Sequence, residues 1–188
     1  MPSSNANQRA VLAAAGFGAI GIICAWVNLT DWRTAAMPLV FYVILVVNTY
    51  FSVRCFSDFP FADARSQKIV DAILVALYVL LALEFSHVVA FLCVSVALFA
   101  VASMKYSLML RTNEYLGFLR RKIILDILCT LACILALGGV IAGFTWVALT
   151  ALVAVFVLGN IYVLVFSDIY RPWPGAKRGY TEHTGNQS

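Results

Sequence analysis

The chain has 188 residues, of which 63% are apolar and only 12% are charged, and its mean hydropathy is +0.92. A soluble domain carries about 45–50% apolar and about 25% charged residues. The excess of apolar residues excludes a soluble enzyme, a disordered chain and a nucleic-acid-binding domain. The composition predicts an integral membrane protein in which most side chains face lipid or other helices.

Six membrane-spanning helices are predicted from the apolar runs. A bilayer core about 30 Å thick needs about 20 helical residues. Two uncharged runs cover 10–29 and 35–53, and a last pair of apolar runs covers 123–143, which contains Asp126, and 144–166. A longer run, 69–104, is too long for one crossing, and we divide it at the polar cluster 84–87. Because backbone groups in lipid must be satisfied internally and no alternating pattern is present, the predicted fold class is an all-α, polytopic helical bundle of three hairpins.

The distribution of basic residues predicts the orientation of these helices. Of the 13 Lys and Arg residues, Arg33 alone falls on the first, third or fifth connection. The others fall on the two tails and on the second and fourth connections: Arg9, Arg54, Arg65, Lys68, Lys105, Arg111, Arg120, Arg121, Lys122, Arg171, Lys177 and Arg178. Since cytoplasmic loops carry an excess of Lys and Arg, we expect both termini in the cytoplasm and place the multi-pass protein in the bacterial inner (plasma) membrane.

A spacing of 56 residues recurs along the chain. It separates Arg9, Arg65 and Arg121, and three tyrosines near the inner helix ends repeat it. One interpretation is a triplicated hairpin within a single transmembrane domain, 1–168. The alternative is that hairpins of similar length align by chance, because Arg and Tyr both favour the inner interface. The predicted segments are the repeats 1–56, 57–112 and 113–168 and a flexible cytoplasmic tail, 169–188.

Four polar residues lie inside the predicted spans near their cytoplasmic ends: Asn48, Asp71, Asp126 and Asn160. A charged residue at the bilayer centre costs about 2.5–3.5 kcal/mol on insertion scales, so polar residues at membrane depth are often functional. One interpretation is a cytoplasm-facing vestibule that binds a substrate, holding a cation or a polar head group. The alternative is structural: Asp71 and Asp126 lie in first helical turns, where an acid complements the helix dipole and pairs with a nearby Lys or Arg.

Glu84 and His87 form a clustered ionisable pair at the predicted outer turn. A His beside a carboxylate titrates around neutral pH, which makes the pair a candidate proton relay or sensor. The alternative is that residues in a turn between two spans are polar in any case.

Small residues run down one face of the first span: Ala14, Gly18, Gly21 and Ala25. A stripe of this kind lets a neighbouring helix approach closely and is typical of helix packing in membranes. The neighbour is either another helix of the same chain or a second subunit, in which case the protein is a homo-oligomer.

No pattern indicates a catalytic residue, a metal site or a cofactor. The chain has two histidines and five cysteines without a Cys-x-x-Cys pair, so we expect no haem, di-iron or zinc site. No pair of carboxylates and no Ser/His arrangement points to hydrolysis. An enzyme is therefore not the favoured interpretation.

The expected partners are membrane lipids, a second copy of the chain and a soluble cytoplasmic protein docking on the tail, with no nucleic acid. Segment 105–122 interleaves aromatic and basic residues, which indicates an amphipathic segment on the anionic inner leaflet. The alternative is that the fourth helix simply continues into the cytoplasm.

Two functions of different classes follow. The first is a small transporter, channel or solute-binding membrane subunit with a cytoplasm-facing polar vestibule. The alternative is a non-enzymatic membrane scaffold or sensor that oligomerises and works with a soluble cytoplasmic partner. A third interpretation, a lipid-modifying enzyme using Asp71 and Asp126, lacks a nucleophile motif.

Overall fold

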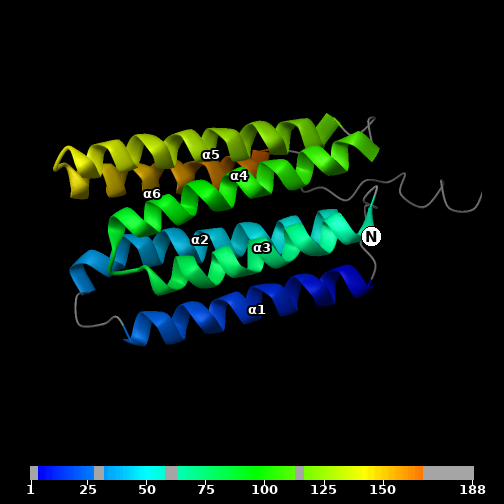
Figure 1. Ribbon diagram of the computed structural model, residues 1–188, viewed down its shortest axis with the longest axis horizontal. Helices are drawn as coiled ribbons and strands as arrows, with labels where there is room; N and C mark the ends of the chain where they lie inside the picture. Colours follow the sequence, from blue (N-terminus) through cyan, green and yellow to red (C-terminus); the bar gives the residue numbers. More distant parts are fainter. Residues whose placement is uncertain (1–3, 28–31, 58–62, 113–116, 167–188) are drawn as a thin grey trace, which may run out of the picture.

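The computed structural model describes residues 4–27, 32–57, 63–112 and 117–166. Within these ranges the regular structure is helical throughout, and six helices are long and apolar enough to cross a membrane (Figure 1). The predicted all-α class is thereby confirmed, whereas the predicted tail, 169–188, lies outside the described residues. The helices are α1 (Ser4–Val27), α2 (Trp32–Phe56), α3 (Ala64–Leu83), α4 (Val88–Thr112), α5 (Gly117–Ile141) and α6 (Thr145–Ile161), which a π-helical turn, η2 (Tyr162–Phe166), continues.

Successive helices run in opposite directions along the bundle (Figure 1). One end therefore holds the first turns of α1, α3 and α5 together with the last turns of α2, α4 and α6; we call it the N-terminal end. The most extensive helix–helix contact joins α4 to α5, which belong to different predicted hairpins. Packing thus links successive hairpins into one bundle.

Four helices begin earlier than the apolar runs that predict them: α1 by six residues, α2 by three, α3 by five and α5 by six. α3 begins at Ala64 and α5 at Gly117, against expected starts of 69 and 123. The prediction began each of these spans only after the last basic residue that precedes the apolar run. A Lys or Arg can nevertheless lie within a helix, because its aliphatic stem runs along the helix while its charged head reaches polar surroundings. Asp63 caps the early start of α3, since its carboxylate accepts hydrogen bonds from the N–H groups of Arg65 and Ser66 at 3.0 and 2.9 Å.

Short turns join α3 to α4 and α5 to α6. The first is the predicted polar cluster 84–87, so the division of the long apolar run is confirmed. α5 ends in a Schellman motif, in which the Phe144 N–H donates to the Gly139 carbonyl at 2.9 Å and the Gly143 N–H donates to the Val140 carbonyl at 3.0 Å. Gly143 has φ +88°, a conformation that only glycine adopts without strain.

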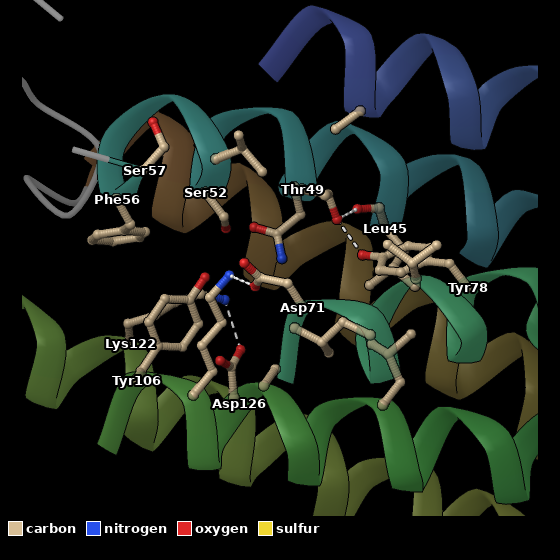
Figure 2. A pocket seen from close by; sticks show the side chains of 18 of the residues that line it. Leu45, Thr49, Ser52, Phe56, Ser57, Asp71, Tyr78, Tyr106, Lys122 and Asp126 are labelled. Atoms are coloured by element: carbon tan, nitrogen blue, oxygen red, sulfur yellow. Dashed lines mark hydrogen bonds and ion pairs between the residues drawn. The ribbon is translucent and has the colours of Figure 1, made fainter. Parts of the chain in front are cut away.

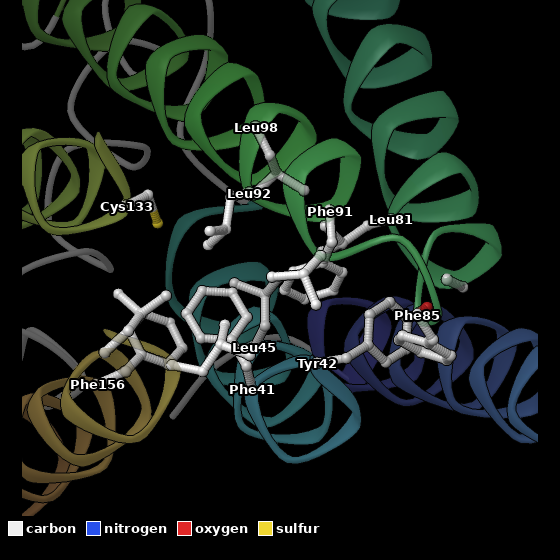
Figure 3. Close-up of a cluster of buried hydrophobic side chains, with 14 of the residues drawn as sticks. Phe41, Tyr42, Leu45, Leu81, Phe85, Phe91, Leu92, Leu98, Cys133 and Phe156 are labelled. Atoms are coloured by element: carbon white, nitrogen blue, oxygen red, sulfur yellow. The ribbon is translucent and has the colours of Figure 1, made fainter. Parts of the chain in front are cut away.

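An aromatic core fills the bundle from its middle toward the far end (Figure 3). Phe41 of α2 stacks on Phe156 of α6, with ring centroids 4.4 Å apart. It meets Phe91 and Phe99 of α4 edge-on at 5.7 and 6.3 Å. Each such pair contributes about 0.5–1.5 kcal/mol beyond burial of its area. Three helices are therefore held together here by rings that carry no charge.

The small-residue face of α1 packs partly inside the chain. A Cβ at Gly21 would come within 2.5 Å of the ring of Tyr42 on α2, whereas a Cβ at Gly18 would meet nothing within 4 Å. The Tyr42 hydroxyl also donates to the Phe17 carbonyl at 3.0 Å, which fastens α2 to α1. Half-buried on the same face are Ala14 and Ala25. Homo-oligomerisation through this face stays a prediction.

Replacing Gly143 with Ala should destabilise the fold by about 1–2 kcal/mol, because an L side chain is strained at positive φ. Gly138→Ala is the matched control. A Cβ at Gly138, within α5, meets nothing within 4 Å, and Ala favours a helix over Gly by about 1 kcal/mol. Unfolding in mixed micelles, followed by circular dichroism, measures both variants. Equal effects of the two substitutions would contradict the conformational requirement at Gly143.

Hydrogen bonds from the Arg65 N–H and from Ser66 lower the pKa of Asp63 below its usual value. A group with a depressed folded pKa stabilises the fold above its unfolded pKa, about 3.9, and loses that contribution as the pH falls through the folded pKa. Asp63→Ala should therefore lower the unfolding temperature at neutral pH, and its difference from the wild type should shrink below about pH 4.

Asp63→Asn is the control for this prediction, because Asn keeps an oxygen that can cap α3. It should recover part of the stability that Asp63→Ala loses at neutral pH. A loss in Asp63→Ala that is the same at neutral and acidic pH would argue against the charged cap.

Candidate ligand-binding vestibule

A cavity of about 300 Å³ lies at the N-terminal end of the bundle, among α1 to α5. Three of the four predicted vestibule residues, Asn48, Asp71 and Asp126, line it, and Figure 2 shows the carboxyl groups of both acids pointing into it. On the side toward the middle of the bundle the cavity is bounded by Leu98 and Phe99, which belong to the aromatic core. We call this space the polar cavity.

An ion pair between Asp71 and Lys105 joins α3 to α4 at this cavity. The Lys105 Nζ lies 2.7 Å from the Asp71 Oδ1, and the two side chains are 22% and 44% exposed. Partly exposed pairs contribute little to stability, with a median of about 0–1 kcal/mol. Either group can therefore exchange its partner for a charged ligand at small cost.

A second ion pair, between Lys122 and Asp126, is almost completely buried. The Lys122 Nζ lies 2.6 Å from the Asp126 Oδ1, and the side chains are only 6% and 2% exposed. The same ammonium lies 5.5 Å from the centre of the Tyr106 ring, close enough for a cation–π contact. Asp126 Oδ2 is buried and has no hydrogen-bond partner among the described residues. Burying two charges costs several kcal/mol per ion, and the pair offsets that cost only while both members are present.

The helix-dipole interpretation of the two acids is wrong. Neither α3 nor α5 has an acid in its first turn, because both helices begin before their predicted starts. Asp71 and Asp126 lie seven and nine residues beyond the first residues of their helices, whereas the dipole acts within the first turn. The ion-pairing half of that interpretation is confirmed by the contacts with Lys105 and Lys122.

Two hydroxyl groups on the cavity wall were not anticipated from the sequence. Thr49 Oγ1 donates to the Leu45 carbonyl at 2.8 Å and shares a hydrogen bond with the Tyr78 hydroxyl, which ties α2 to α3. Since Thr49 uses its proton on the carbonyl, Tyr78 is the donor in that second bond. Both residues sit inside apolar runs, and a lone hydroxyl there carries no signal in sequence.

A second cavity, of about 180 Å³, lies between α5 and α6 with one residue of α2 on its wall. We call it the apolar cavity, because most of its lining residues are apolar. The fourth predicted residue, Asn160, lines it and donates to the Phe156 carbonyl at 2.8 Å. Asn48, Lys122 and Asp126 line both cavities. The structure thus places the four predicted residues at two adjoining cavities, with Asn160 outside the polar one; their role in binding stays a prediction.

Glu84 and His87 lie at the far end of the bundle, in the turn between α3 and α4. The His87 Nδ1 lies 3.3 Å from the Glu84 Oε2, and the His side chain is 76% exposed. The pair is therefore formed but is separated from the polar cavity by the length of the aromatic core. A proton-relay or sensor role for it stays a prediction.

The described part of segment 105–122 consists of helix ends. α4 continues to Thr112 and α5 begins at Gly117. This favours the alternative in which the fourth helix simply extends beyond its apolar run. Binding of the segment to an anionic leaflet remains untested by the fold.

Neither family models nor curated proteins nor solved structures gave a match to this chain. The six apolar helices of the described ranges are compatible with an integral membrane protein. Any finer assignment has to come from the geometry of the two cavities.

Lys122→Met should destabilise the fold by about 3–5 kcal/mol, because it leaves the Asp126 carboxylate buried without its counter-charge. The double variant Lys122→Met/Asp126→Leu should recover most of that loss. Lys105→Met, which breaks the partly exposed pair, should cost less than about 1 kcal/mol. Unfolding in mixed micelles ranks the three variants, and equal losses from the two single substitutions would contradict the difference in burial.

Proposed function

We propose that the protein binds a small anionic solute at the cytoplasmic face of the bacterial inner membrane, as a transporter or as the solute-binding subunit of one. The observation that carries this proposal is the charge of the polar cavity. Its described lining residues include three cationic and two acidic side chains: Arg9, Lys105, Lys122, Asp71 and Asp126. One positive charge in excess, inside a bundle of apolar helices, favours a ligand with a negative group.

The distribution of basic residues supports the orientation in this proposal. Within the described ranges, the Lys and Arg residues other than Arg33 belong to helix turns near the N-terminal end of the bundle. Arg33 belongs to the first turn of α2, at the far end. By the positive-inside rule the N-terminal end is expected to face the cytoplasm, which supports a cytoplasmic position for the polar cavity and for both ends of the chain.

The aromatic core supports a binding site rather than an open pore. Leu98 and Phe99 bound the polar cavity, and the stacked rings of Phe41 and Phe156 lie beyond them. A hydrophilic route straight through one protomer would have to cross these rings, which argues against an open channel. A solute entering from the cytoplasm would instead stop at the core, as in a cytoplasm-open binding state.

The alternative function, a membrane scaffold, would require a second copy of the chain to pack against the small-residue face of α1. At Gly21 that face is already occupied by Tyr42 of the same chain. No contact in the described ranges favours the scaffold over solute binding. The polar cavity is therefore the proposed binding site.

Ser52 offers a direct test, because it lines the polar cavity and is 8% exposed. In a variant without the five native cysteines, Ser52→Cys should react with a membrane-impermeant thiosulfonate in inside-out vesicles and be protected in right-side-out vesicles. An anionic reagent should react faster than a cationic one, after correction for their rates with free cysteine, because of the excess positive charge. Millimolar acetate, succinate or inorganic phosphate should slow the reaction.

Ser95→Cys is the matched control. Ser95 is fully buried in α4, its hydroxyl donates to the Phe91 carbonyl at 2.9 Å, and it is not among the residues that line the polar cavity. It should stay unlabelled in both kinds of vesicle. Labelling of Ser52→Cys from the opposite side would overturn the orientation, and indifference to every anion would overturn the binding proposal.

A further inference from the structure

The polar and apolar cavities adjoin at three residues that line both, Asn48, Lys122 and Asp126, and we call these residues the neck. From this neck the apolar cavity follows α5 as far as Ala132, about 9 Å toward the middle of the bundle at helical rise. The lining of the two adjoining cavities therefore changes from charged at the N-terminal end to mainly apolar toward the middle of the bundle. A ligand that fills both cavities must therefore be charged at one end and apolar at the other.

The apolar cavity is open toward the outside of the bundle between α5 and α6. Leu128 and Val155 on its walls are 55% and 59% exposed. Gly159, also on the wall, leaves a gap, since a Cβ there would meet nothing within 4 Å. In a membrane this outward surface faces hydrocarbon, so an acyl chain reaches the cavity from the bilayer without passing through water.

We propose that the ligand of the vestibule is an amphiphile with an anionic head group and a single acyl chain, such as a long-chain fatty acid. The inference rests on the proposed function, because it places the anionic group in the polar cavity beside Arg9 and Lys105. The chain passes the neck and occupies the apolar cavity.

Volume and direction both support this ligand class. The apolar cavity, about 180 Å³, is slightly larger than the apolar cavity of about 150 Å³ that stays dry and binds benzene in an engineered protein. It is suited to part of one chain. The head lies toward the N-terminal end and the chain toward the middle of the bundle, which is how a lipid of the cytoplasmic leaflet is oriented in the proposed topology. Each methylene withdrawn from water strengthens binding about fourfold.

The test compares two carboxylates that differ only in chain length. Ser52→Cys protein without native cysteines is placed in nanodiscs of a zwitterionic phospholipid, and the rate of thiosulfonate labelling is measured with butyrate or palmitate. Palmitate should protect the Ser52→Cys thiol from labelling at a concentration at least about tenfold lower than butyrate does, because the palmitate chain also fills the apolar cavity.

Gly159→Leu fills the apolar cavity and should raise the protecting palmitate concentration about tenfold while leaving protection by butyrate unchanged. Gly16→Leu is the matched control, since Gly16 is an exposed glycine of α1 whose Cβ would also meet nothing within 4 Å. Gly16→Leu should change neither the protecting concentration of palmitate nor that of butyrate. Ala132→Leu, at the deep end of the cavity, is a second filling variant that should behave like Gly159→Leu, and the yield of folded protein is measured for all three.

The failures of the two proposals differ. Equal protection by palmitate and butyrate, or an equal effect of Gly16→Leu and Gly159→Leu, overturns the amphiphile and leaves anion binding in place. Protection by phosphatidylglycerol in the disc, with none by palmitate, overturns the single-chain ligand. A Ser52→Cys thiol that no reagent reaches overturns the proposed function, and the amphiphile falls with it.

Discussion

The buried ion pair between Lys122 and Asp126 determines which face of α5 turns inward. Its two side chains are 6% and 2% exposed, with 2.6 Å between Nζ and Oδ1. Both residues lie on the same side of α5, one helical turn apart, so they are buried or exposed to lipid together. Placing an ion in hydrocarbon costs far more free energy than burying it beside a partner of opposite charge and other polar groups. That side of α5 therefore has to face the interior of the bundle. The position of the polar cavity follows from this orientation.

The two halves of the bundle are held together by different interactions. Near the N-terminal end the helices are linked by polar contacts across the cavity, from Asp71 to Lys105 and from Tyr78 to Thr49. Toward the far end the links are stacked and edge-on aromatic rings centred on Phe41. Polar contacts tolerate water and an exchange of partners, whereas close-packed rings exclude both. An accessible site is therefore compatible with one half of the bundle, and a closed core occupies the other.

The sequence predicted the helix number and the 84–87 turn because span length and polar interruptions are properties of the chain alone. It also brought Asn48, Asp71 and Asp126 to one depth, since depth follows from counting residues along a helix. It missed the helix starts, and it gave no indication of the bond between Thr49 and Tyr78. A contact between helices depends on how each rotates about its own axis, and helices that are apolar all round carry little signal for that rotation.

Three buried side-chain oxygens in the described ranges have no hydrogen-bond partner, those of Ser57, Ser103 and Asp126, and only the one of Asp126 belongs to a charged group at the neck. Asp126 Oδ2 is buried and has no hydrogen-bond partner among the described residues, and an unmet buried acceptor costs about 1–3 kcal/mol. Glu84 and His87, in contrast, form a pair in which the His side chain is 76% exposed, so water can complete its hydrogen bonds. Proteins keep unsatisfied buried groups mainly where something else requires them. The unsatisfied carboxylate oxygen therefore favours a functional role for the neck over one for the solvated pair at the far turn.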